Sequence, residues 1–182
     1  MKKRITKVTT KRGDDGTTMM ADGSRVSKSD TLINVIGELD ELNSWIGLLS
    51  TADVMQEEKD FLFEIQNTLF DIGGRLSIKS NLPIKKNKIE ELETKIQNIN
   101  ENLPDLENFI LPGGSKESSL IHITRSVCRR TERSMTRVYE AAFFEKNNLV
   151  YLNRLSDFLF VLARQVNIKL GEKEFLWSQE EL

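Results

Sequence analysis

Apolar residues recur at steps of three and four along most of the chain, which is the spacing of one helix face. The first such run begins near residue 30 and contains Leu32, Val35, Ile36, Leu39, Leu42, Ile46 and Leu49. A second run, over residues 54–78, contains Phe61, Ile65, Leu69, Ile72 and Leu76. The pattern predicts two amphipathic helices, the second weakened at Gly73-Gly74.

A polar link over residues 79–86 leads into a third predicted helix. Asn87, followed three residues later by Glu90, resembles a capping box and predicts a helix over 88–101. Pro104 lies just beyond this helix and would prevent its continuation.

Two longer helices are predicted after a connector over residues 104–114. Ser115 is a favourable N-cap residue and predicts a helix over 116–144. Asn147-Asn148 predicts a break before a fifth helix over 149–170.

The remaining segments lack helical periodicity. Residues 1–28 are rich in Lys, Thr, Asp and Gly and are expected to form a loop. Gly171 would end the fifth helix and leave a tail over 172–182. No segment shows convincing strand alternation. We predict an all-α fold, an up-and-down five-helix bundle over 29–171, within a single domain over 1–182.

Composition narrows the function classes. The 182 residues suit one domain, and 26 Lys and Arg against 28 Asp and Glu give a net charge of −2. That balance disfavours general binding to nucleic acid or to an anionic membrane. Cys128 is the single cysteine, which excludes an intramolecular disulfide. The sequence has no apolar run that would form a signal peptide or a membrane span, so we expect a cytoplasmic protein.

Polar residues gather on one side of the predicted fourth helix. At about 100° per residue, Arg125, Arg129 and Glu132 form a narrow stripe, with Arg133 beside it and Arg130 further round. One interpretation is a solvent-exposed face with ion pairs between residues four apart. The other is a phosphate site, because the planar guanidinium group matches phosphate oxygens.

Two other regions carry candidate binding groups. On the fifth helix, Asn153, Asp157 and Arg164 line up opposite the apolar face. In isolation they would form a solvent-exposed stripe, and beside the arginines of the fourth helix they could form a polar site between the two helices. In the N-terminal loop, Lys11 and Arg12 lie among glycines and threonines whose backbone N–H groups suit an anion-binding nest. The sequence lacks the Gly-Lys-Ser/Thr spacing of a P-loop.

Five segments, in order, resemble motifs of the PduO-type ATP:cob(I)alamin adenosyltransferases. They are TKRGDDG (10–16), GELDELNS (37–44), FILPGGS (109–115), RSVCRRTER (125–133) and YLNRLSD (151–157). The resemblance runs from about residue 8 to residue 165. It implies an enzyme that moves the 5′-deoxyadenosyl group of ATP to the cobalt of reduced cobalamin. It also implies a homotrimer with each active site between neighbouring subunits.

The resemblance assigns nucleotide binding to two groups of residues. The N-terminal loop would contribute Thr10, Lys11, Arg12, Gly13, Thr18 and Lys28. The fourth and fifth helices would contribute Arg129, Arg130, Glu132, Arg133 and Asn153. Mg²⁺ would be carried by the ATP phosphates rather than by a protein metal site.

Four residues receive catalytic roles from the same resemblance. Arg129 would hold the triphosphate in the transition state, and Asp40 would pair with Arg125 across the subunit contact. Phe109 would displace the lower ligand of cobalt. The implied protein partners are a flavin-type reductase and an acceptor enzyme that depends on adenosylcobalamin.

The chain departs from the family pattern at two positions. Asp15 stands where a lysine is usual, which reverses a charge near the expected triphosphate. Ile36 replaces a common tyrosine and is expected to change packing only. The charge reversal leaves open a nucleotide sensor that has lost turnover.

Two other protein classes fit the sequence less well. A ferritin-like di-iron protein would share the bundle, but Ser119 stands three residues before His122, where that class needs a glutamate. An arginine-rich RNA-binding bundle conflicts with the net charge.

Four further residues are expected to be structural rather than catalytic. His122 is expected to be a partly buried helix residue and Cys128 a small packing residue. Trp45 and Trp177 are expected to serve in packing or in an interface.

Overall fold

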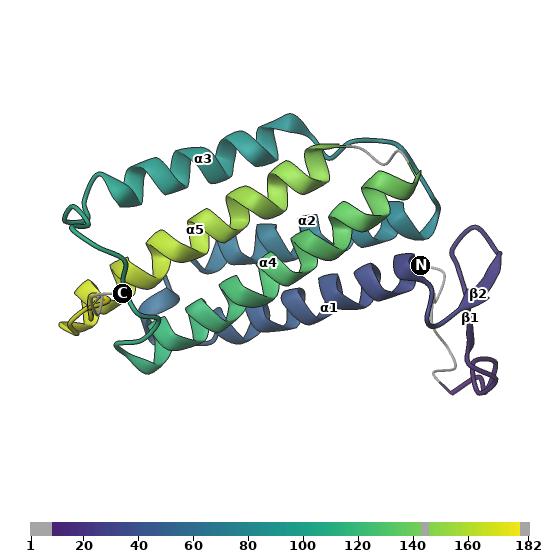
Figure 1. Ribbon diagram of the computed structural model, residues 1–182, viewed down its shortest axis with the longest axis horizontal. Helices are drawn as coiled ribbons and strands as arrows, with labels where there is room; N and C mark the ends of the chain where they lie inside the picture. The colour runs from purple at the N-terminus through teal and green to yellow at the C-terminus, as the bar shows by residue number, and fades with distance from the viewer. Residues whose placement is uncertain (1–8, 143–145, 179–182) are drawn as a thin grey trace.

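Five helices run alternately up and down, and their long axes lie close to the long axis of the molecule (Figure 1). The computed structural model describes residues 9–142 and 146–178. The helices are α1 (Thr31–Leu49), α2 (Lys59–Ser77), α3 (Lys86–Asn100), α4 (Lys116–Ala142) and α5 (Lys146–Leu170). The helix α1 packs against α2 and α4, and α5 packs against α4 and α3. The predicted all-α bundle is confirmed.

The predicted apolar stripes form one continuous core. Leu42 and Ile46 of α1, Ile72 of α2 and Leu155 of α5 are completely buried. Burying such a side chain contributes about 1.5–3 kcal/mol, so the stripes provide the main stabilisation of the bundle. Within residues 9–142 and 146–178, no helix is both long enough and apolar enough to cross a membrane.

The ends of the two longest helices form as their capping residues predict. The backbone N–H of Ser118 donates to Oγ of Ser115 at 3.0 Å, which caps α4. Gly171 ends α5 with a φ of 70°, and the N–H of Glu172 donates to the carbonyl of Asn167 at 2.9 Å. That bond closes the last turn, as is typical of a glycine-terminated helix.

Three predicted helix starts are wrong. The helix α3 begins at Lys86, so Asn87 lies inside it. The side-chain amide of Asn87 donates to Glu91 at 3.0 Å instead of capping the helix. The pair Asn147-Asn148 lies within α5 and forms no break, because Asn148 is 4% exposed and faces the interior. The helix α2 begins at Lys59 after a single 3₁₀ turn, Asp53–Met55. The predicted end of the fourth helix, residue 144, lies outside the described residues.

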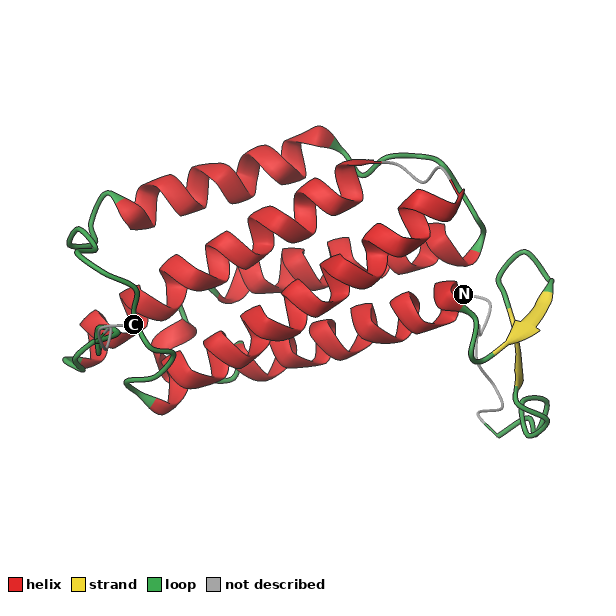
Figure 2. Cartoon of the chain, viewed as in Figure 1, coloured by secondary structure: helices red, strands yellow, loops and turns green. Residues whose placement is uncertain are grey.

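Part of the predicted N-terminal loop is a β-hairpin. Strands β1 (Thr17–Met19) and β2 (Arg25–Ser27) pair antiparallel, with Thr18 opposite Val26. Three-residue strands are too short to reveal their alternation in the sequence. Met20 is 5% exposed and follows β1. The hairpin therefore lies at one end of the bundle, beside the start of α1 (Figure 2).

Candidate functional site

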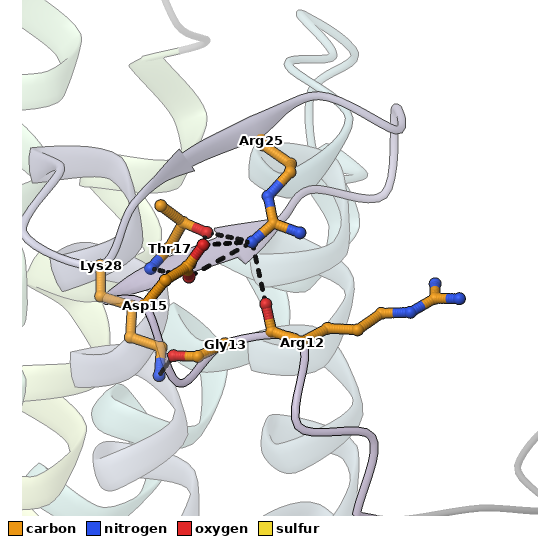
Figure 3. A network of polar contacts seen from close by, with 6 residues as sticks. All are labelled: Arg12, Gly13, Asp15, Thr17, Arg25 and Lys28. Carbon is orange, nitrogen blue, oxygen red and sulfur yellow. Dashed lines mark hydrogen bonds and ion pairs between the residues drawn. The ribbon is translucent and has the colours of Figure 1, made fainter.

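Residues 12–17, which we call the anchored turn, are held by two cations that follow them in the chain (Figure 3). Nζ of Lys28 donates to the carbonyl of Gly13 at 2.8 Å. The guanidinium of Arg25 donates to the carbonyl of Arg12 at 2.8 Å. A Cβ at Gly13 would lie 3.1 Å from the carbonyl oxygen of Thr17 and 3.2 Å from Nζ of Lys28. Glycine is therefore needed for this close approach.

Asp15 is part of the framework of this turn. Its carboxylate accepts hydrogen bonds from the backbone N–H of Thr17 at 3.0 Å and from its hydroxyl at 2.7 Å. The same carboxylate forms an ion pair with Arg25 at 3.1 Å. The Thr17 hydrogen bonds, assisted by Arg25, lower the pKa of Asp15 below its ordinary value. The charge of Asp15 is therefore balanced by Arg25, the first residue of β2.

The other predicted loop residues lie around the anchored turn. Thr10 and Lys11 are exposed just before it, and Lys11 adopts a left-handed backbone with a φ of 59°. Thr18 lies on β1 and is half-buried. The structure thus gathers the predicted nucleotide-binding residues of the N-terminal segment at the hairpin end of the bundle.

A groove of about 610 Å³ opens beside the hairpin, between α1 and α2. We call it the hairpin groove; it is lined by residues that include Thr18, Met20, Asp40 and Phe70. Phe70 is 69% exposed. The carboxylate of Asp40 forms no ion pair with any residue in the ranges 9–142 and 146–178. An unpaired charge and an exposed aromatic ring in one groove are features of a surface that receives another molecule.

The arginine stripe of α4 divides into paired and unpaired members. Arg130 forms an ion pair with Glu41 of α1, and Arg133 donates to the carbonyl of Arg129 at 3.0 Å. Arg129 is exposed and its guanidinium has no partner among the residues that the structure describes. The unpaired donors of Arg129 are available to an anionic ligand.

Next to the stripe, α4 and α5 share a polar contact. Glu132 accepts a hydrogen bond from the amide of Asn153 at 3.2 Å. Both residues were predicted to serve the nucleotide, and the structure brings them together. One interpretation of the stripe was a set of exposed ion pairs between residues four apart on α4. The hydrogen bond of Glu132 instead joins α4 to α5.

Arg125 is a partly buried arginine of the stripe without a charged partner among the described residues. Its guanidinium lies 5.9 Å from the ring centre of Phe160, and within the described residues its buried Nε has no hydrogen-bond partner. Burial, followed by repulsion from Arg129, lowers the pKa of Arg125. The predicted partner Asp40 lies in the hairpin groove and does not reach Arg125 within one chain.

The opposite end of the bundle carries Phe109 on an exposed connector. Phe109 is 77% exposed, and its ring lies 6.3 Å from the ring of Trp177, edge to face. Ile110 forms a β-bridge with Leu176, so the C-terminal residues lie alongside the connector. Sequence reasoning missed this contact, because neither segment has a periodic pattern.

Arg164 is buried, so the interpretation of Asn153, Asp157 and Arg164 as a solvent-exposed stripe is wrong for this residue. Its side chain is 3% exposed and forms an ion pair with Glu174 at 3.0 Å. It also donates to the carbonyl of Pro104 at 2.8 Å. The C-terminal segment covers this part of α5, which the helix pattern alone could not reveal.

His122 and Cys128 have structural environments. His122 is 3% exposed, and burial lowers its pKa to about 4. The thiol of Cys128 donates to the carbonyl of Leu152 at 3.3 Å, and burial raises its pKa. A neutral histidine and a protonated, buried thiol suit packing rather than nucleophilic catalysis. In the described ranges, no group of three or more His, Cys, Asp or Glu side chains could hold a metal ion.

These observations define a class of protein: a helical bundle with a cationic turn at one end, an arginine stripe along its side and an exposed aromatic residue at the other end. Comparison with known proteins gives this class a family. The model of the cobalamin adenosyltransferase family matches residues 8–166. A cobalamin adenosyltransferase from Cupriavidus metallidurans is 45% identical over 181 residues, which cover 99% of this chain and 98% of the relative. A corrinoid adenosyltransferase from Bacillus subtilis is 40% identical over 172 residues, which cover 91% and 89%.

Solved structures agree with the sequence comparison. A variant PduO-type ATP:corrinoid adenosyltransferase from Lactobacillus reuteri, complexed with cobalamin and ATP, superposes with a TM-score of 0.89 at 32% identity and covers 94% of this chain and 96% of that chain. Another variant from that organism, complexed with ATP, has a TM-score of 0.88 at 33% identity and covers 94% and 100%. The chain belongs to the family of PduO-type ATP:corrinoid adenosyltransferases. Corrinoid adenosyltransferase activity follows from this membership, and the di-iron and RNA-binding alternatives are excluded.

Proposed function

We propose that the chain transfers the 5′-deoxyadenosyl group of ATP to the cobalt of cob(I)alamin. Cobalt(I) supplies the electron pair that forms the bond to the 5′ carbon. The bond between that carbon and the triphosphate oxygen breaks, so the products are adenosylcobalamin and inorganic triphosphate. Since cobalt is the nucleophile, the protein has to hold the triphosphate, align the two reacting atoms and exclude water.

In this proposal the cations of the chain act on the triphosphate. Lys11 and Lys28 would approach it from either side of the anchored turn, and Arg129 and Arg133 would approach it from α4. Negative charge grows on the leaving oxygen during transfer, and fixed donors that meet this charge can lower the barrier by about 3–4 kcal/mol each. The guanidinium of Arg129 is exposed and has no partner within residues 9–142 and 146–178, which supports this role.

The active site would lie between neighbouring subunits of a homotrimer. Two charged residues without partners support this proposal. Neither Arg125 nor Asp40 has a charged partner among the residues described for one chain. A second copy that brought Asp40 to Arg125 would cover the hairpin groove, including the exposed ring of Phe70. It would also bring the anchored turn of one subunit to the arginine stripe of the next.

Mixed trimers test this arrangement. One variant would carry Lys28→Ala and another Arg129→Ala, so that each homotrimer has every active site damaged. If sites are shared, random mixing places an intact turn against an intact stripe at about one quarter of the interfaces. Adenosylation of chemically reduced cob(I)alamin, followed by absorbance, should then recover in co-expressed mixtures and stay low in each variant alone. Mixtures no more active than the single variants would place the whole site within one chain.

Several accompanying features belong to the same proposal. Mg²⁺ would be bound by the ATP phosphates, as this ion often is. A flavin-type reductase would deliver electrons to cobalt, and an adenosylcobalamin-dependent enzyme would accept the product. A cytoplasmic location fits the single cysteine, which is buried and reduced.

A further inference from the structure

The C-terminal segment 172–178, which we call the tail, forms a short antiparallel ladder with the connector. The N–H of Leu111 donates to the carbonyl of Phe175 at 2.8 Å, and the N–H of Trp177 donates to the carbonyl of Phe109 at 2.7 Å. The bridge between Ile110 and Leu176 lies between these two bonds. This register sets Trp177 directly opposite Phe109, so the two side chains lie on the same face of the ladder as a cross-strand pair.

The two rings meet with a defined geometry. Their centroids are 6.3 Å apart and their planes are inclined by 62°, which is an edge-to-face contact. Phe109 is otherwise exposed, so few neighbours restrict its rotation. The side-chain amide of Asn108 adds a hydrogen bond to the carbonyl of Trp177 at 2.8 Å. The tail therefore limits the orientations that the Phe109 ring can adopt.

A buried ion pair holds the tail in place. Arg164 is 3% exposed and contacts Glu174 of the tail at 3.0 Å and the carbonyl of Pro104, at the start of the connector, at 2.8 Å. We call these contacts the Arg164 clasp. Because a buried guanidinium needs both a counter-charge and hydrogen bonds, the clasp fixes the tail and the connector to the same point of α5.

We propose that Trp177 is a positioning residue for the reduction of cobalt, held by the Arg164 clasp. The inference rests on the proposed function and on the role that the family resemblance gives to Phe109, which is to exclude the lower ligand from cob(II)alamin. With that ligand excluded, cobalt is four-coordinate and accepts one electron from a dihydroflavin more readily. The proposed role of Trp177 is to keep the Phe109 ring at the angle that excludes the ligand. Trp177 itself does not contact the reacting atoms.

The test separates the reduction step from the transfer step. Trp177→Ala should lower the fraction of bound cob(II)alamin that is four-coordinate, measured by electron paramagnetic resonance with ATP present. The expected decrease is roughly two- to tenfold, the population change that one aromatic pair supports. Turnover that starts from cob(II)alamin and dihydroflavin should fall by a similar factor. Turnover that starts from chemically reduced cob(I)alamin should stay near the wild-type rate.

Matched variants of the tail provide the controls. Trp177→Phe keeps an aromatic edge and should restore most of the four-coordinate signal. Leu176→Ala alters the neighbouring side chain, which points to the other face of the ladder, and should leave both assays unchanged. Glu174→Ala should reproduce the Trp177→Ala result by opening the clasp. In a Trp45→Phe background Trp177 is the sole tryptophan, and its emission should shift to longer wavelength when Glu174 is replaced.

Defined outcomes would overturn the inference. They are an unchanged four-coordinate fraction in a folded Trp177→Ala variant, or equal losses of turnover from cob(II)alamin and from cob(I)alamin. Failure of Trp177→Phe to restore the signal would also contradict it. If the wild-type protein does not adenosylate cob(I)alamin, the proposed function fails instead, so the two failures are distinguishable.

Discussion

The two ends of the bundle are built on opposite principles. At the hairpin end, the anchored turn is polar and exposed, and the ion pair between Asp15 and Arg25 lies in solvent. At the connector end, the Arg164 clasp is buried and holds two segments that are far apart in the sequence. Exposed ion pairs contribute little to stability, whereas breaking a buried pair is strongly destabilising. The hairpin end can therefore adjust to the triphosphate that we propose it binds, and the connector end keeps a fixed shape.

Paired truncations should produce the largest contrast between the ends. Deletion of residues 1–18 should abolish ATP binding with little change in melting temperature, because the anchored turn adds little to the core. Deletion of residues 172–182 should lower the free energy of unfolding by about 3 kcal/mol, because Arg164 loses Glu174. Calorimetry with ATP and thermal denaturation measure the two effects. Equal melting shifts for both truncations would remove the distinction between the ends.

Asp40 tests whether the hairpin groove stays exposed in the assembly. If a neighbouring subunit covers the groove, Asp40→Asn should misplace Arg125 and lower turnover by up to about 100-fold, as misalignment near a reacting centre can. The charge-matched control is Asp60→Asn, at an exposed position in the first turn of α2. Steady-state rates with cob(I)alamin measure the effect. A fully active Asp40→Asn trimer would show that the groove stays open to solvent.

His122 gives the connector side of the bundle a pH-dependent stability. Burial, assisted by Arg125 and opposed by Glu174, lowers its pKa to about 4 in the folded protein. As pH falls from about 6.5 to 4, the unfolded chain takes up a proton that the folded chain excludes, so stability is lost in this window. The expected loss is about 1–3 kcal/mol.

The carboxylates also titrate in this range, so a matched variant isolates the histidine. His122→Gln removes the titrating group, and its stability should fall less steeply than that of the wild type between pH 6.5 and pH 4. Urea denaturation at several pH values measures the difference. Identical slopes for the two proteins would mean that folding does not lower the pKa of His122.

Asp15 should give the smallest effect. Asp15→Asn retains an acceptor for the N–H of Thr17 and loses only the exposed ion pair with Arg25. The ATP dissociation constant should change by less than about fivefold. Calorimetry checks this value, with Asp22→Asn as a control at the hairpin turn, where Asp22 accepts from the N–H of Ser24 in the same way. A much larger change would mean that the carboxylate itself acts on the ligand.

Helix identity and the core were predictable, whereas the contacts made by loops were not. Stripes such as Leu39, Leu42 and Ile46 fix a helix face because their period matches the helical repeat. Asn148 predicts a break between helices because asparagine is common in turns, and the sequence does not show that this asparagine is buried inside α5. Arg164 was misplaced because the tail that covers it has no periodic pattern. The nucleotide-binding roles rest on motif resemblance, and the structure of one chain brings only some of those residues together.

The Arg164 clasp also has a consequence for synthesis on the ribosome. Domains form from the N-terminus onward during translation. A nascent chain that has emerged up to the end of α5 already presents Arg164 and Pro104, whereas Glu174 and Trp177 emerge later. The end of the molecule that would handle cobalt is therefore completed after the rest of the bundle. A chain that terminates early would keep an unpaired buried guanidinium, which makes it a substrate for cellular proteases.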